Sequence, residues 1–450
     1  MTALTGGARV TGAVPSGRAA AYALGNVGLA CFLVTPQLLL LYFLTDTLGV
    51  PAATAGVVVM VPKIWEVVLD PVIGAVSDRL RGRFGRRWPL MALGSLFFPL
   101  GFAAMFMPPP GWPMTATLGW VLLAYIGTST AYALFSIPYA TTVGEASPDQ
   151  AVRNRLIAWR VGLLCVGLLV ASGLSPLLLR LGGGGRHGYA VMGIAVAAIA
   201  GAALFGSLRA NWLLQNRAVE QLRPASVRQS LRTGLRATLG NRGYRLLWTG
   251  YACQTLAMGA QFALMPYAVR YQLHAGTDVI TDLAVVATVV QIVAMPLWVR
   301  VADRIGTAPA AALAAFAYGA AALGYLLCGS GDIGLAVTVA ALSGLGQAGC
   351  YMLPFALMPS VVSGVDPDDA ARNAGFLTAI WVSGEKLGLA LGGAAAGLML
   401  GWVGYASGAA DQPAAVLRWL PILFAGIPAL LLAAGGLFLL ALKRSSRAAG

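Results

Sequence analysis

The sequence comprises 450 residues, of which 58% are hydrophobic and only 10% are charged. Soluble globular proteins carry about 25% charged residues, so this chain lacks the charges needed to cover the surface of a soluble domain. Its high apolar fraction also excludes a disordered chain. Together with a mean hydropathy of +0.77, the composition indicates a protein that is solvated mostly by lipid.

The net charge of +14 does not indicate a nucleic-acid partner, because the arginines lie between apolar runs, as in the cytoplasmic loops of membrane proteins. The five cysteines form no CxxC pair and the two histidines stand far apart, so we expect no disulfide framework, metal site or other cofactor. Residues 1–18 are polar and lack an apolar core. We therefore expect the first span, rather than a cleavable signal peptide, to direct insertion.

The apolar runs of the chain predict an all-α membrane protein, because a spanning helix needs about 20 apolar residues and the connections between the runs are short. We expect twelve spans, at 19–45, 51–78, 88–107, 114–145, 152–181, 188–213, 244–272, 279–302, 307–328, 333–363, 371–402 and 415–443.

Basic residues gather in alternate connections, after spans 2, 4, 8 and 10 and in the long connection 214–243, whereas the connection 108–113 reads PPPGWP. By the positive-inside rule, both termini then face the cytoplasm, which requires an even number of spans. We expect a monomeric, multi-pass protein of the inner (plasma) membrane.

An internal repeat divides the chain. The pattern PDxAxRN occurs at 148–154 and again at 367–373, and the Asp-Arg pair at 78–79 recurs at 303–304, an offset of 225 residues. These matches predict two pseudo-symmetric six-helix halves, 1–213 and 244–450, joined by a basic linker at 214–243. Such a parallel duplication is the plan of a major facilitator transporter, whose solute site lies near the midplane between the halves.

Span 2 contains three charged residues, Lys63, Glu66 and Asp70, and their spacings of three and four place them on one face of a helix. Charge inside a membrane is costly, so this face must meet a partner or a water-filled cavity. Clustered carboxylates suit a proton or a hard cation. The alternative is a packing stripe in which Lys63 neutralises Glu66, although Asp70 would still lack a partner.

Two more buried charges fall in the predicted spans 5 and 11. Lys386 could neutralise the acids of span 2 from the opposite half, and the planar fork of Arg160 suits hydroxyls, a carboxylate or a phosphate. The alternative for Arg160 is that it extends to the cytoplasmic surface. Aromatic residues near these charges could stack on a sugar-like ring, or could instead serve as packing and interface anchors. They are Trp65, Tyr139, Trp159, Tyr351 and Trp381.

The arginine-rich connection after span 2 could close the cytoplasmic side through charge contacts with helix ends. The candidate gating residues are Asp78, Arg79, Arg83, Arg86 and Arg87, with Asp303 and Arg304 at the equivalent place in the second half. No nucleotide-binding motif occurs in the chain, so we expect coupling to an ion gradient rather than to ATP.

The residues of span 2, KxWExxxDPxxGxxxDR at 63–79 followed by GRFGRRWP at 82–89, resemble the glycoside–pentoside–hexuronide:cation symporters, the melibiose permease family of the major facilitator superfamily. The strings YALGN at 22–26, YFLTDTLG at 42–49 and SIPY at 136–139 support this resemblance. It implies symport of a small, polar, sugar-like solute with sodium, lithium or protons by alternating access.

Residue by residue, the resemblance implies that Glu66 and Asp70 bind the cation, with Lys386 facing that site and Lys63 as a neighbouring basic residue. It also implies that Arg160 contacts the sugar. Asn26 and Tyr139 lie in family motifs and, together with Lys63, complete the candidate solute site, while Ser136 joins the candidate cation site.

The departures from the family pattern are informative. Galactoside carriers have an acid where this chain has Ala30, and a further acid where it has Ser136. Loss of the first acid argues against galactoside specificity. Two carboxylates and a hydroxyl could still hold sodium, but a proton needs only one acid, so the sequence favours protons as the coupling ion.

Other functions remain open at this point. Lysophospholipid carriers share the fold of this family, and the loss of a hydroxyl-reading acid would tolerate a lipid headgroup. A transporter-like sensor that binds its ligand without moving it is a further alternative. A membrane enzyme is disfavoured, because the chain has no Ser/His/Asp arrangement and only two histidines.

Overall fold

The computed structural model describes residues 15–80, 87–146, 149–214, 242–362 and 367–447. The helices up to residue 214 are, in chain order, α1 (Ser16–Ala23), α2 (Gly25–Tyr42), α3 (Ala52–Arg79), α4 (Trp88–Met105), α5 (Met114–Ala146), α6 (Gln150–Leu169), α7 (Ser175–Leu181) and α8 (Gly185–Leu214). Those that follow residue 241 are α10 (Arg242–Tyr267), α11 (Thr277–Ile305), α12 (Thr307–Gly324), α13 (Ile333–Val362), α14 (Pro367–Trp402), α15 (Ala414–Pro421) and α16 (Ile427–Arg447).

Short irregular turns join several of these helices into longer spans. Four of them are π-helical turns, η1 (Phe43–Thr47), η2 (Val170–Leu174), η3 (Ala268–Gln272) and η5 (Ile422–Gly426), and a 3₁₀ turn, η4 (Tyr325–Leu327), follows α12. Such turns add a residue to the helical ladder and occur often at functional sites.

The predicted spans are confirmed: each corresponds to one helix, or to consecutive helices and turns, with bounds that agree within four residues. By length and composition, ten spans among the described residues could cross a membrane. The remaining two predicted spans correspond to α10 with η3, and to α14. The chain is therefore an all-α, multi-pass membrane protein.

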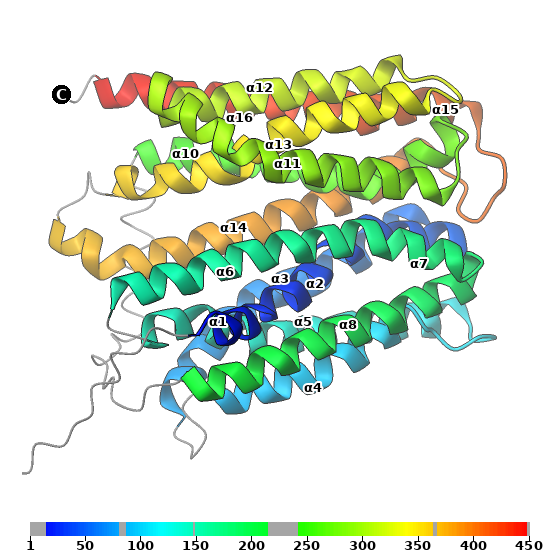
Figure 1. The fold of residues 1–450 in the computed structure, drawn as a ribbon. Helices are drawn as coiled ribbons and strands as arrows, with labels where there is room; N and C mark the ends of the chain where they lie inside the picture. Colours follow the sequence, from blue (N-terminus) through cyan, green and yellow to red (C-terminus); the bar gives the residue numbers. More distant parts are fainter. Residues whose placement is uncertain (1–14, 81–86, 147–148, 215–241, 363–366, 448–450) are drawn as a thin grey trace, which may run out of the picture.

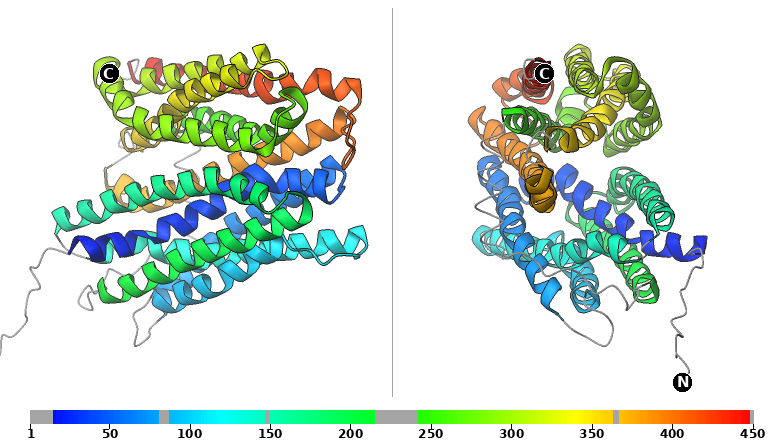
Figure 2. Two further views of the ribbon diagram at one scale, coloured as in Figure 1. Left: turned by 45° about the vertical axis from the view of Figure 1, so that its right-hand side comes forward. Right: turned by 90° about the vertical axis from the view of Figure 1, so that its left-hand side faces the viewer.

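The helices form two groups that lie side by side (Figures 1 and 2). In the first, α4 packs on α5 and α8, and α2 packs on α6 and α8; in the second, α10 packs on α14 and α16, and α13 packs on α11 and α12. The two groups meet where α3 packs along α14, α2 packs on α10, and α7 with η2 packs on α11. The predicted linker lies almost entirely outside the described residues.

The helix α1 begins and α16 ends at the same end of the bundle (Figure 1). We call the opposite end the distal end; it carries the turns η1 and η3 and the connections that follow them.

Small residues let α3 and α14 approach closely near the distal end. A Cβ atom added at Gly397 would lie 2.7 Å from the carbonyl oxygen of Ala52 and 2.7 Å from the Cα of Gly56. Glycine and alanine at helix contacts allow this approach in membranes, where packing rather than hydrophobicity holds helices together. This contact sets the distance between the two groups of helices.

We predict that Gly397→Ala lowers the stability of the protein in detergent by roughly 1–3 kcal/mol, the usual cost of overpacking. The measurement is thermal unfolding of the purified variant. The control is Gly127→Ala on α5, where an added Cβ would meet nothing within 4 Å. Equal unfolding temperatures for the two variants would contradict the close contact of α3 with α14.

Candidate functional site

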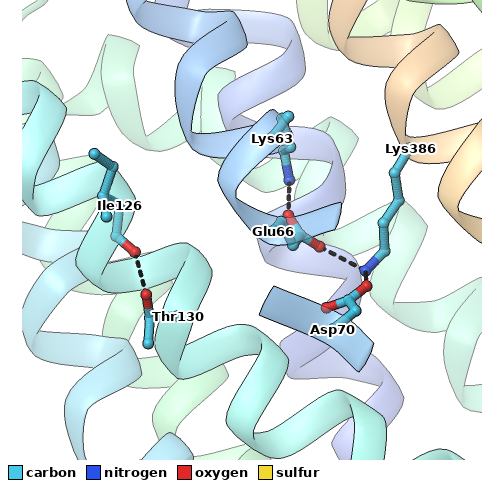
Figure 3. A network of polar contacts seen from close by, with 6 residues as sticks. All are labelled: Lys63, Glu66, Asp70, Ile126, Thr130 and Lys386. Carbon is cyan, nitrogen blue, oxygen red and sulfur yellow. Dashed lines mark hydrogen bonds and ion pairs between the residues drawn. The ribbon is translucent and has the colours of Figure 1, made fainter. Parts of the chain in front are cut away.

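A chain of buried ion pairs links the two groups of helices (Figure 3). On α3, Lys63 Nζ lies 3.0 Å from Glu66 Oε2. From α14, Lys386 Nζ lies 2.7 Å from Glu66 Oε1 and 2.7 Å from Asp70 Oδ2. The structure thus brings the predicted acids of span 2 together with the predicted lysine of span 11.

This arrangement follows from the spacing along α3, which places the three charged side chains on one face of the helix; Glu66 and Asp70 of this face contact Lys386 of α14. Glu66 is completely buried and the side chain of Lys63 is 9% exposed. Removing ions from water costs several kcal/mol each, and only close partners offset that cost. The two lysines and two carboxylates of the cluster balance each other in charge.

Aromatic rings surround the ammonium groups. Lys63 Nζ lies 4.0 Å from the centroid of the Phe32 ring and 5.8 Å from that of Tyr125, while Lys386 Nζ lies 5.3 Å from that of Tyr132. The negative faces of these rings stabilise the cations where water is excluded. Sequence reasoning missed these residues, because an aromatic side chain in an apolar span carries no signal of what it faces.

Three oxygen atoms of the candidate cation-site residues have no hydrogen-bond partner. Asp70 Oδ1 and Ser136 Oγ are buried without a hydrogen-bond partner, and Glu66 Oε1 has its ion-pair contact but no hydrogen bond. Within the described part of the chain, no three His, Cys, Asp or Glu side chains gather as a metal site would require. The free oxygens could accept a proton or a single small cation.

A second cluster brings three predicted solute residues together on α2, α5 and α6. Asn26 Nδ2 donates to the carbonyl oxygen of Arg160 at 2.6 Å, and the guanidinium of Arg160 lies 4.3 Å from the centroid of the Tyr139 ring. The Tyr139 hydroxyl in turn donates to the carbonyl oxygen of Tyr22 at 3.0 Å. Arg160 forms no ion pair with any carboxylate that the structure describes.

The remaining solute candidates lie in the second group of helices. Trp381 on α14 is fully buried and stacks on Tyr251, with ring centroids 4.4 Å apart and an angle of 11° between the rings. Its Nε1 has no hydrogen-bond partner. Tyr351 on α13 is half-buried. Neither joins the Arg160 cluster, and their role as solute contacts stays a prediction.

The candidate gating residues are described only in part. Arg83 and Arg86, and the side chains of Asp78 and Arg79, lie outside the described residues. Arg87 is buried and its Nη1 donates to Ser77 Oγ at 3.2 Å, which ties the start of α4 to the end of α3.

At the equivalent place in the second half, Asp303 and Arg304 are exposed at the end of α11. Neither forms an ion pair with a described residue, and their role as gating residues stays a prediction.

Comparison with known proteins agrees with this architecture. Residues 21–443 match the model of a family described as MFS/sugar transport protein. The chain belongs to this family. It is therefore a transporter of the major facilitator superfamily and not an enzyme.

Individual relatives cover most of the chain. A putative glycoside/cation symporter of Escherichia coli, YagG, is 24% identical over 93% of this chain and 89% of its own length. A glucuronide carrier protein homolog of the same organism is 25% identical over 88% and 86%. Among solved structures, the nucleoside transporter NupG has a TM-score of 0.67 at 14% identity, over 95% of this chain and 98% of its own, which is a likeness of fold.

We predict that Lys386→Met destabilises the protein by about 3–5 kcal/mol, the usual cost of leaving a buried charge without its partner. Adding Asp70→Asn to this variant should restore part of the loss, because the uncompensated charge is removed. Denaturant unfolding in detergent measures both effects. The control is Arg209→Met, which changes an exposed arginine on α8. If the effects of Lys386→Met and Asp70→Asn on the free energy of unfolding were additive, this would contradict the ion pair.

Proposed function

We propose that the protein is a symporter that couples the movement of a sugar-like solute to a cation gradient, with Glu66 and Asp70 as the coupling acids. The observation that carries the proposal is the position of Lys386, which lies between both carboxylates from the opposite group of helices. In this proposal the units 1–213 and 244–450, which the linker 214–243 joins, rock against each other around the site between them, as in other transporters built from repeats.

Lys386 takes the place of the coupling ion, as a cation that is covalently attached to α14. When the coupling ion is absent, Lys386 neutralises Asp70 and Glu66 and holds α14 against α3. When a cation binds to Asp70, it neutralises the carboxylate, so the attraction between this side chain and Lys386 is lost. One of the two ion pairs between the halves is then released, and the barrier to rearrangement falls.

The donor set favours a proton over sodium. A sodium ion needs several oxygen ligands, as hard cations do, yet Glu66 is already held by both lysines. Only Asp70 Oδ1 and Ser136 Oγ are buried without any contact partner among the four coupling residues. A single carboxylate oxygen is enough to take up a proton. We therefore propose protons as the coupling ion.

The proposed solute site is the cluster of Arg160, Tyr139 and Asn26. The guanidinium offers several donors in one plane, which suits adjacent hydroxyls or a carboxylate, and the Tyr139 ring beneath it provides an apolar face. The relatives named for glycosides and for glucuronides support a sugar-like solute. Lys63 is occupied by Glu66, so its proposed contact with solute requires that this ion pair opens.

The proposed setting is the inner (plasma) membrane, with both termini in the cytoplasm, and the working unit is a monomer. The charge distribution of the loops supports this orientation by the positive-inside rule. The distal end then faces away from the cytoplasm.

We predict that Asp70→Asn abolishes concentrative uptake, because the amide cannot take up a proton, while the protein remains folded. The measurement uses proteoliposomes and labelled pentosides, hexosides and glucuronides, with a pH gradient or a sodium gradient imposed separately. The native chain should accumulate its solute on the pH gradient alone. The control is Asp282→Asn, which changes an exposed acid on α11. Accumulation at the wild-type level by Asp70→Asn would contradict the assignment of the coupling site. Accumulation by the native chain on a sodium gradient alone would contradict the choice of protons as the coupling ion.

We predict that Arg160→Ala weakens solute binding by roughly 1.5–3 kcal/mol, the usual worth of hydrogen bonds to a charged group. Arg160→Lys should recover only part of the affinity, because an ammonium cannot form two parallel hydrogen bonds. Isothermal titration calorimetry with the transported solute measures both. An unchanged affinity in Arg160→Ala would instead favour a structural role for the arginine.

A further inference from the structure

The first and second halves each contain the same turn at the distal end. η1 and η3 are π-helical turns that begin 225 residues apart, the offset of the Asp-Arg repeat. In both turns, the backbone N–H of the leucine that follows the turn donates a hydrogen bond to the carbonyl oxygen of the first residue of the turn. Leu48 donates to Phe43 and Leu273 donates to Ala268, each with a nitrogen–oxygen distance of 3.0 Å. The next residue has a positive φ in both, 74° at Gly49 and 51° at His274.

The two repeat-related turns pack against each other. The rings of Tyr42 and Tyr267, which occupy equivalent positions in the repeat, lie edge to face with centroids 5.1 Å apart. Arg270 Nη1 donates to the Tyr42 hydroxyl at 2.9 Å, and the hydroxyls of Tyr267 and Thr45 lie 2.7 Å apart. Residues 42–49 of the first half thus contact residues 267–274 of the second.

Asp46 lies at the centre of this contact. Its Oδ1 accepts a hydrogen bond from the Tyr271 hydroxyl at 2.7 Å, and its Oδ2 accepts one from the Tyr405 hydroxyl at 2.7 Å and one from Thr45 at 2.9 Å. Hydrogen bonds to an ionised acceptor are about twice as strong as neutral ones. Two of the three donors belong to the second half, so the protein itself supplies them only while the halves are together.

We propose that residues 42–49, residues 267–274 and Tyr405 form a gate, which is closed at the distal end, and that Asp46 is its latch. The proposal rests on the alternating access proposed above, which requires the distal end to open once in each cycle. In the closed gate, the other half supplies the donors that a half-buried carboxylate needs. In the open gate, water from the distal side supplies them, so both states satisfy the acid and the element is bistable.

Other contacts between the halves assist this gate without depending on it. Gln37 Nε2 donates to the carbonyl oxygens of Gly259 at 3.2 Å and Leu389 at 3.1 Å. The hydroxyls of Ser172 and Thr288 lie 3.3 Å apart. These are neutral hydrogen bonds, which contribute less than those to a carboxylate. Apart from the ion pairs of Lys386, the hydrogen bonds to Asp46 are therefore the contacts between the halves whose loss should matter most.

The test measures the opening of the distal end directly. Spin labels at Thr115→Cys and Ser330→Cys, two exposed positions at the distal ends of opposite halves, report the distance between the halves by double electron–electron resonance. The background has the five native cysteines replaced by alanine or serine. The sample is the purified chain in lipid nanodiscs without solute.

Asp46→Ala should raise the ratio of the long-distance to the short-distance population about tenfold or more, which is the effect of losing at least one hydrogen bond to a charged group. The double variant Tyr271→Phe with Tyr405→Phe should do the same while keeping both rings. Asp411→Ala, which removes an exposed acid at the same end, is the control and should leave the distribution unchanged.

Unchanged distance distributions in the double variant would overturn the proposal, and this variant decides the question if Asp46→Ala does not fold. A shift of equal size in Asp411→Ala would also overturn it, because the effect would then be one of net charge. The experiment needs neither solute nor gradient. Its failure is therefore distinct from a failure of cation coupling, which the uptake of solute by proteoliposomes tests.

Discussion

A balanced group of four charges, sealed from water, is the constraint on which the rest of this structure depends. Glu66 has no exposed surface, and a carboxylate in such a place survives only beside cations. One of these cations, Lys386, comes from α14, so the stability of α3 requires that the other half of the chain be present and correctly placed. The close packing of Gly397 on Ala52 and the rings around the ammonium groups both serve that placement.

The same constraint explains how a transporter can be stable although its two halves are not held permanently in one arrangement. An isolated buried ion pair would hold the halves permanently, but a shared lysine has two carboxylates to satisfy it. Neutralising Asp70 leaves Lys386 with Glu66, so the cluster loses a contact without leaving a bare charge. In the proposed mechanism, the energy of ion binding at Asp70 acts in this way on the packing of α3 against α14.

The twelve spans and the charged residues of the cluster could be predicted from the sequence, because both follow from properties that can be read along the chain. These are the length of the apolar runs and the cost of placing charge in lipid. It could not reach the partners of those charges. Tyr132 and Phe32 are ordinary aromatic residues of apolar spans until the fold brings them to the lysines. Asp46 stood in a recognisable motif, but two of its three donors lie more than 200 residues away.

The repeat-related turns have a consequence for the history of the chain. If both halves were copies of the first, Asp46 would face a second aspartate where Tyr271 now lies, and two carboxylates would repel each other without the tyrosine donor of the other half. If both were copies of the second, two tyrosines would meet without the carboxylate that accepts their hydrogen bonds. The divergence of these equivalent positions therefore made each half dependent on the other, and a dimer of either half alone could not form the contact that the fused chain forms.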